Sequence, residues 1–67
     1  MAYMNRGNAY GKLGKRQRAI QDYDEAIRLN PQFASAYNNR SVAYQSLGKR
    51  KLAERDFQKV KERGYNL

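Results

Sequence analysis

The chain repeats itself after 34 residues. At that shift, twelve of the 33 aligned residue pairs are identical, where composition alone would give roughly two or three. The first members of the identical pairs are Ala2, Tyr3, Asn5, Arg6, Ala9, Tyr10, Leu13, Gly14, Lys15, Arg16, Ala19 and Asp22. Tyr23 recurs conservatively as Phe57. A repeat of this length indicates one supersecondary unit used twice, so residues n and n+34 are expected to occupy equivalent places.

Each unit is predicted to be a pair of helices joined by a glycine turn. The expected helices span 2–13, 16–29, 33–47 and 50–63. Gly14 and Gly48 are expected to end the first and third helices, because glycine readily adopts the positive φ of a helix C-terminus. Asn30-Pro31 is expected to end the second helix, because the residue before proline avoids the α region.

Apolar stripes on these helices predict a core within and between the units. Tyr3, Tyr10 and Leu13 share a face of the first helix at helical spacing. The stripe on the second helix consists of Ala19, Ile20, Tyr23, Ala26 and Ile27. The small residues Ala9, Ala19 and Ala26 are expected to let the two backbones approach closely. The repeated tyrosines are expected in the core rather than exposed for stacking on bases.

The first unit resembles a tetratricopeptide repeat. The residues that carry the resemblance are Tyr3, Gly7, Tyr10, Gly14, Ala19, Tyr23, Ala26 and Pro31, together with the run 37–44. Tyr3 and Tyr37 depart from the family pattern, which often has tryptophan there. The resemblance implies an all-α fold of two stacked antiparallel helical hairpins, a short right-handed solenoid of four helices. It also implies a protein-binding groove lined by the first helix of each hairpin.

The second unit carries the features expected of a chain end. One domain is expected over 1–67, with repeat one at 1–33 and repeat two at 34–67. Three apolar positions of the second helix become charged in the fourth: Ile20, Ile27 and Leu29 are replaced by Glu54, Lys61 and Arg63. The last helix of a solenoid needs a polar outer face for solubility. The fourth helix is therefore expected to be a charged C-terminal cap.

Composition argues against catalysis and against bound metal. The chain has no cysteine and no histidine, which removes the commonest general base, thiolate nucleophile and metal ligands. Two acidic clusters occur, formed by Asp22, Asp24 and Glu25 and by Glu54, Asp56 and Glu62. We expect both on exposed helix faces, paired with cations three or four residues away. The sequence thus predicts a non-enzymatic protein with no catalytic residues, no metal site and no cofactor.

The net charge is strongly positive and favours acidic partners. Fourteen lysines and arginines against six acidic residues give a charge of +8, which attracts acidic peptides, nucleic acids or anionic surfaces. Arg6 and Arg40 recur on the first helices and could reach the groove or pair between the units. No signal-peptide core and no membrane-spanning run is visible in the sequence, so a cytoplasmic location is expected.

Asparagines are the main candidates for peptide binding. Asn5, Asn8, Asn38 and Asn39 are predicted to floor the groove, with Lys12 and Lys15 at its rim. An asparagine side chain has both a donor and an acceptor, which suits it to hold a peptide amide; a merely solvated polar face is the alternative. The resemblance also suggests the carboxylate clamp of co-chaperones, because Asn8 and Asn39 match two of its five positions. Met4 stands where that clamp has lysine, and the remaining positions belong to a third repeat.

A second basic surface is expected at the hairpin turns. Both turns should fall at the same end of a solenoid, which would gather Lys15, Arg16, Arg18, Lys49, Arg50 and Lys51 into one basic ridge. The ridge offers an alternative function, binding to nucleic acid or another anionic surface. Ordinary solvated turn charge is the simpler interpretation.

Self-association is a third possibility. Two repeats are fewer than the three usually needed for stability, so the chain could act as a scaffold that assembles through its own end faces. Straightening at Gly48 would give a domain-swapped dimer, because a glycine within a helix costs only about 1 kcal/mol.

Overall fold

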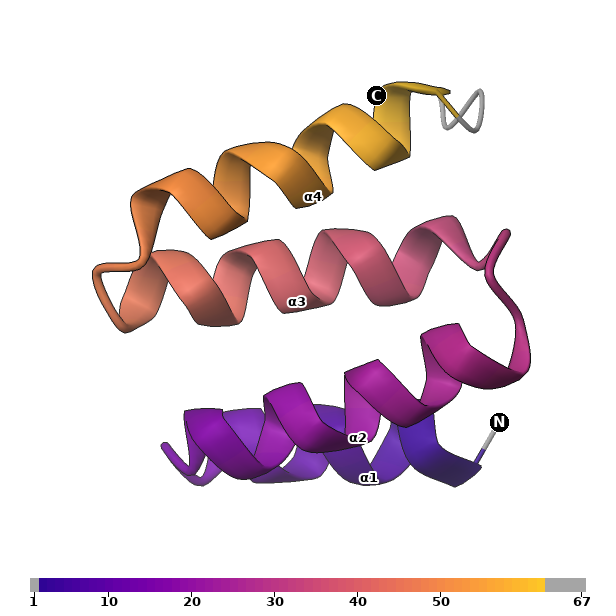
Figure 1. The fold of residues 1–67 in the computed structure, drawn as a ribbon. Coiled ribbons are helices and arrows are strands. Elements are labelled where there is room, and N and C mark those ends of the chain that lie inside the picture. Colours follow the sequence, from indigo (N-terminus) through magenta and orange to yellow (C-terminus); the bar gives the residue numbers. More distant parts are fainter. Residues whose placement is uncertain (1, 63–67) are drawn as a thin grey trace.

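The computed structural model describes residues 2–62 and contains four helices there. These are α1 (Ala2–Lys12), α2 (Arg16–Leu29), α3 (Ala34–Ser46) and α4 (Arg50–Glu62). Successive helices run antiparallel and each packs on the next one in the chain; α1 lies beside α2, and α3 contacts both of them (Figure 1). The expected all-α fold of two stacked hairpins is confirmed. Arg63 of the predicted cap lies outside the described residues.

Each hairpin turn is closed by a glycine in the left-handed region. Gly14 has φ of 80° and Gly48 has φ of 76°. In the first turn the Gly14 N–H donates to the Gly11 carbonyl at 3.0 Å, and the Lys15 N–H donates to the Tyr10 carbonyl at 2.9 Å. The second turn repeats both bonds 34 residues later. This pair of bonds satisfies the last carbonyls of a helix, so each first helix ends one residue earlier than predicted, with the leucine in the turn.

The link between the hairpins is held by side chains on both sides of Pro31. The Gln32 N–H donates to Asn30 Oδ1 at 3.2 Å, and the Tyr37 hydroxyl donates to the Pro31 carbonyl at 3.1 Å. The second bond attaches the link to a buried residue of α3. The direction in which α3 leaves α2 is therefore set locally, which brings α3 alongside both α2 and α1.

Close approach of α1 and α2 depends on Gly7 rather than Ala9. A methyl group at Gly7 would lie 2.7 Å from Tyr23 Cε1, so the tyrosine ring packs where a side chain would otherwise stand. Ala19 and Ala26 are buried as predicted, but Ala9 is exposed. The prediction for Ala9 was wrong because that face of α1 has no neighbouring helix within the described residues.

Within the described residues no helix lies beside this face of α1, and this explains two other differences from the predictions. Leu13 is 71% exposed and Tyr3 is 36% exposed, although both were expected on a packing face. The remaining repeated tyrosines are buried or half-buried: Tyr10, Tyr23, Tyr37 and Tyr44. One face of α1 therefore keeps the apolar character of a packing surface while lying open.

Two aspartates expected on exposed faces are buried instead. Asp22 and Asp56 are 4% and 3% exposed. Each accepts two hydrogen bonds from the arginine sixteen residues before it, with distances of 2.9 and 2.7 Å in both hairpins. The arginines are Arg6 and Arg40, whose guanidinium groups also lie over tyrosine rings of their own helices. Within residues 2–62, the ion pairs along one helix join Glu25 with Arg28 and Lys59 with Glu62, and all four side chains are at least about one-third exposed.

Arg40 also connects the two hairpins. Its Nη1 donates to Asp24 Oδ1 of α2 at 2.8 Å, in addition to its two bonds with Asp56 of α4. Of the two roles left open for Arg6 and Arg40, pairing between the units is thus the one that Arg40 takes. The Arg40 side chain of α3 thus links α2 and α4 through two ion pairs.

Candidate functional site: the groove between α1 and α3

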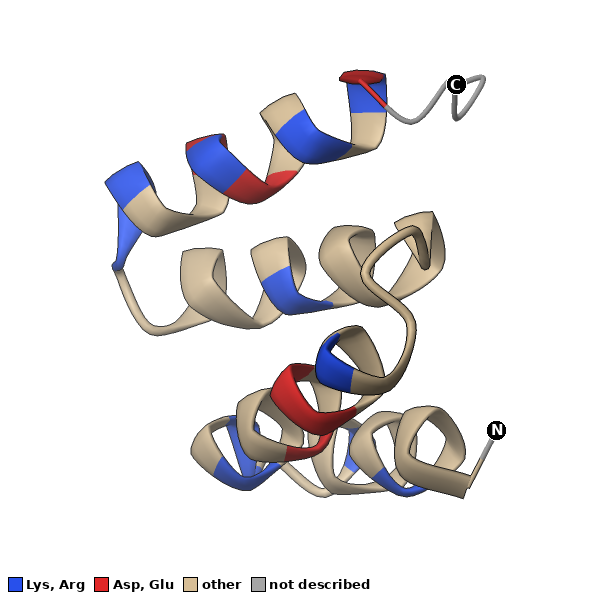
Figure 2. Cartoon of the chain, turned by 45° about the vertical axis from the view of Figure 1, so that its right-hand side comes forward, with Lys and Arg blue, Asp and Glu red and all other residues tan. Residues whose placement is uncertain are grey.

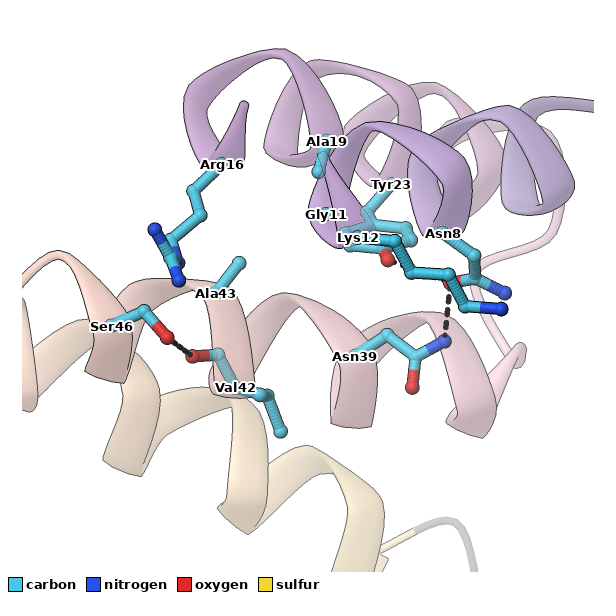
Figure 3. A pocket seen from close by; sticks show the side chains of 10 residues that line it. All are labelled: Asn8, Gly11, Lys12, Arg16, Ala19, Tyr23, Asn39, Val42, Ala43 and Ser46. Atoms are coloured by element: carbon cyan, nitrogen blue, oxygen red, sulfur yellow. Dashed lines mark hydrogen bonds between the residues drawn. The ribbon is translucent and has the colours of Figure 1, made fainter. Parts of the chain in front are cut away.

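A groove of about 370 Å³ lies where α1 and α3 face each other across α2 (Figure 3). Three helices contribute its lining: Asn8, Gly11 and Lys12 from α1, Arg16, Ala19 and Tyr23 from α2, and Asn39, Val42, Ala43 and Ser46 from α3. Its lining includes the small apolar residues Ala19 and Ala43, which are buried. Polar side chains complete the lining, as is usual for sites that bind a short ligand segment.

Asn8 is held in one orientation by two donors. The Tyr23 hydroxyl donates to Asn8 Oδ1 at 2.6 Å, and Asn39 Nδ2 donates to the same oxygen at 3.0 Å. Both lone pairs of this oxygen are therefore used inside the protein. Burial and the nearby Asp22 carboxylate raise the pKa of Tyr23, so its hydroxyl remains a donor at neutral pH.

The two asparagines leave one donor and one acceptor for a ligand. Asn8 Nδ2 and Asn39 Oδ1 form no hydrogen bond with other described residues. The close view shows the two amides on opposite sides of the groove, joined by the bond to Asn8 (Figure 3). A peptide group has one N–H and one C=O, which matches this donor and acceptor.

The groove is positively charged. Lys12 and Arg16 line it, whereas none of its lining residues is acidic. Within residues 2–62, neither cation belongs to an ion pair. An arginine guanidinium can bind a carboxylate with two parallel hydrogen bonds. The arrangement can therefore hold a short segment that carries negative charge.

Three of the six residues predicted for the groove line it, namely Asn8, Lys12 and Asn39. Asn5, Asn38 and Lys15 are not among its lining residues. Asn5 is exposed on α1, Asn38 is half-buried on α3, and Lys15 lies in the turn. The groove forms between facing sides of two different helices, so its two asparagines are 31 residues apart and not 34.

Sequence reasoning did not place the other seven lining residues in the groove, and two of them, Tyr23 and Arg16, bring polar groups. Tyr23 was expected only in the core, and Arg16 only in the ridge, yet both line the groove. A signal for Tyr23 is present in the repeat: the second unit has Val42 in place of Asn8 and Phe57 in place of Tyr23. The amide and the hydroxyl that bonds to it are thus absent together from the second unit, which indicates that they work as a pair.

The predicted ridge residues lie in the two hairpin turns and in the first residues of α2 and α4. Figure 2 shows basic residues at the beginning of α4 and, on the same side, at the α1–α2 turn. None of the six ridge residues belongs to an ion pair with another described residue, although Arg18 lies over the Tyr10 ring at 5.8 Å. The ridge is a strongly charged surface, and its Lys49 borders a small hollow that is also lined by Ile20, Tyr44 and Leu47.

Other classes of site have no support in the described part of the chain. Over residues 2–62 no cluster of acidic side chains has the arrangement needed to hold a metal ion. In the same range no helix is both long enough and apolar enough to cross a membrane.

Comparison with known families agrees with this architecture. A model described as tetratricopeptide repeat matches residues 1–33, and a second model with the same description matches residues 22–55. The first match covers α1 and α2, and the second covers part of α2, α3 and the beginning of α4. Comparison with curated proteins gave no match. Tetratricopeptide repeats are protein-interaction modules, and by its sequence and its structure this chain belongs to the tetratricopeptide repeat family.

Proposed function

We propose that this protein is a non-enzymatic adaptor whose groove between α1 and α3 holds an extended, acidic segment of a partner protein. The observation that carries the proposal is the bond between Asn39 and Asn8, which leaves one donor and one acceptor directed to a ligand. An extended segment has unpaired backbone groups that such a pair can bind, whereas a folded helix or sheet has already used them.

The charges around the groove support an acidic segment. Lys12 and Arg16 lie on the α1–α2 side, and Val42 on the opposite side is 51% exposed. A segment with a carboxylate near Arg16 and an apolar side chain near Val42 would satisfy both sides. The groove is small, so we expect micromolar or weaker affinity from this chain alone.

Two variants test the site with fluorescently labelled peptides. Short acidic peptides are titrated against the wild-type chain and against the double variant Asn8→Ala/Asn39→Ala. We expect about a tenfold loss of affinity, because two hydrogen bonds of about 0.7 kcal/mol each are removed. Asn5→Ala/Asn38→Ala is the matched control, since it removes two asparagines of the same helices that do not line the groove. Equal losses in both double variants would refute the proposed site.

The basic ridge supports a second candidate function, binding to nucleic acid. Its support is the set of cations that have no acidic partner within residues 2–62. A single-stranded DNA probe separates the two candidates. Ridge binding should weaken steeply with salt and should be lost in Lys49→Glu/Arg50→Glu, while Asn8→Ala/Asn39→Ala binds normally. Groove binding of the acidic peptide should show the opposite pattern.

A further inference from the structure

A hollow of about 260 Å³ lies between α3 and α4, and we call it the α3–α4 hollow. It shares no lining residue with the groove between α1 and α3. The second helix of the hairpin contributes Leu52, Arg55, Asp56 and Lys59, and α3 contributes two tyrosines and Arg40. The α3 residues of the hollow and those of the groove lie at different helical positions, so the two sites occupy different sides of α3.

Two cations of the α3–α4 hollow are available to a ligand. Asp56 is acidic, but both of its oxygens accept hydrogen bonds from Arg40, at 2.9 and 2.7 Å. Arg55 belongs to no ion pair among residues 2–62, and Lys59 reaches Glu62 only at 3.9 Å, between side chains that are both 49% exposed. An exposed pair of that kind contributes little to stability. Arg55 and Lys59 are four residues apart, which places them on the same side of α4.

The hydroxyl of Tyr44 supplies a third donor in the same hollow. It forms no hydrogen bond with another residue in the part of the chain that the structure describes. Burial raises the pKa of Tyr44, so the hydroxyl keeps its proton at neutral pH and can donate it in a hydrogen bond. The Arg40 guanidinium, which is bound by Asp24 and Asp56, lies 5.8 Å from the centre of the Tyr44 ring. The ring therefore has a well-fixed neighbour.

The positive charge of the hollow is absent from the equivalent place in the first hairpin. At n−34, Arg55 and Lys59 correspond to Gln21 and Glu25. One neutral and one acidic side chain are thus replaced by two cations, and Glu25 is occupied by its pair with Arg28. The two hairpins share the same packing, so the fold does not require the cations of α4.

Three donors from two helices suit a phosphate group better than a carboxylate. A carboxylate has two oxygens, whereas a phosphate monoester has three terminal oxygens and a charge of about −1.5 to −2 at pH 7. Arg55, Lys59 and the Tyr44 hydroxyl can each bind a different one of these oxygens. Leu52 lines the same hollow and is 37% exposed, so it offers an apolar contact to the carbon atoms that carry the phosphate.

We propose that the α3–α4 hollow is a binding site for the phosphate group of a phosphomonoester. Arg55 and Lys59 neutralise its charge, the Tyr44 hydroxyl donates to its third oxygen, and Leu52 contacts the group to which it is attached. Because the hollow shares no residue with the groove, this ligand can bind whether or not the groove holds a peptide.

An NMR titration of the nitrogen-15-labelled chain with phenyl phosphate tests the site. The signals of Leu52 and of the Arg55 side chain should shift and saturate, and the affinity should weaken as pH falls below about 6, where the monoester becomes a monoanion. Shifts of equal size at the ridge residues Lys49 and Arg50 would overturn the proposal, because they would show diffuse attraction to a chain of charge +8. So would shifts that do not saturate.

Two further probes identify the source of the phosphate. A short phosphoserine peptide that binds more tightly than inorganic phosphate would assign the hollow to a phosphorylated segment of a partner. Equal affinities would assign it to a free phosphate. Equal binding of the same peptide without its phosphate would overturn the proposal, because the three donors would then recognise something else.

A double variant with a matched control completes the test. Arg55→Gln/Lys59→Glu gives α4 the residues of the first hairpin at two exposed positions, so the fold should persist. Its affinity for phenyl phosphate should fall at least about tenfold, because two charge-assisted contacts are lost. Arg50→Gln/Lys61→Glu makes the same chemical changes at exposed positions of α4 that do not line the hollow, and its affinity should fall far less. Equal losses in the two double variants would overturn the proposed site.

Discussion

Asn39 donates a hydrogen bond from its side-chain amide to Asn8 Oδ1 at 3.0 Å, and this bond joins the first helices of the two hairpins across the groove. The same oxygen accepts the Tyr23 hydroxyl from α2 at 2.6 Å. One side-chain oxygen thus connects three helices in the groove that we propose as the peptide site. The other polar atom of each amide, Asn8 Nδ2 and Asn39 Oδ1, is directed away from these bonds (Figure 3).

Removing the Tyr23 hydroxyl should disorder the groove without unfolding the protein. In Tyr23→Phe, Asn8 loses one of its two donors, so its amide is less fixed and we expect a two- to fivefold loss of peptide affinity. The fold should persist, because the second hairpin already has Phe57 at the equivalent place. NMR relaxation of the Asn8 side-chain amide measures the loss of order directly. Tyr44→Phe is the control: it removes a hydroxyl outside the groove, and an equal effect there would contradict the assignment.

Replacing each of two glycines of α1 by alanine should change the free energy of unfolding in opposite directions. At Gly7 the added methyl would meet Tyr23 Cε1 at 2.7 Å and Asp22 Cβ at 3.2 Å. The ring is buried and bonded to Asn8, so we expect a loss of about 1–2 kcal/mol in spite of alanine's higher helix propensity. At Gly11 the nearest atom is the Tyr23 hydroxyl at 4.0 Å, and Gly11→Ala should gain about 0.5–1 kcal/mol. Urea unfolding of both variants measures the change in the free energy of unfolding. A stabilising Gly7→Ala would contradict the packing described.

Arg40 should contribute more to stability than its repeat equivalent Arg6. Arg40→Met leaves Asp56 buried without a partner and also breaks the bond to Asp24 between the hairpins. Breaking a buried ion pair costs about 3–5 kcal/mol, which is a large part of the stability of a small domain. Arg6→Met should cost less, because the Arg6 side chain is 60% exposed and bonds to one carboxylate only. Thermal melts monitored by circular dichroism give the order, and equal melting temperatures would remove the linking role of Arg40.

Acid should destabilise the protein through Asp22. Hydrogen bonding to Arg6 lowers the pKa of Asp22 below its ordinary value of 3.8. A carboxyl whose pKa is lower in the folded state contributes stability above the unfolded pKa and loses it as pH falls through the folded pKa. The melting temperature should therefore fall as pH drops below about 4. Asp22→Asn should be less stable at neutral pH, and its deficit should shrink in acid; a constant deficit would show that Asp22 is not the titrating group.

The sequence by itself determined the repeat, the helices and the turns, because these depend on local chemistry. Gly14 and Gly48 end α1 and α3 through backbone bonds that involve only neighbouring residues. Proline after Asn30 ends α2 in the same local way. These features were sufficient to predict the fold class and to recognise the family.

Only the tertiary structure decided which residues lie together on one surface. A repeat states that Asn5 corresponds to Asn39 and Ala9 to Ala43, but a groove or an interface forms between facing sides of neighbouring helices. Those sides carry different positions of the repeat, so Asn39 meets Asn8 and not Asn5. Ala43 is buried, whereas its repeat equivalent Ala9 is exposed. The reason is that burial depends on whether a neighbouring helix faces the residue, and the repeat pattern does not give that information.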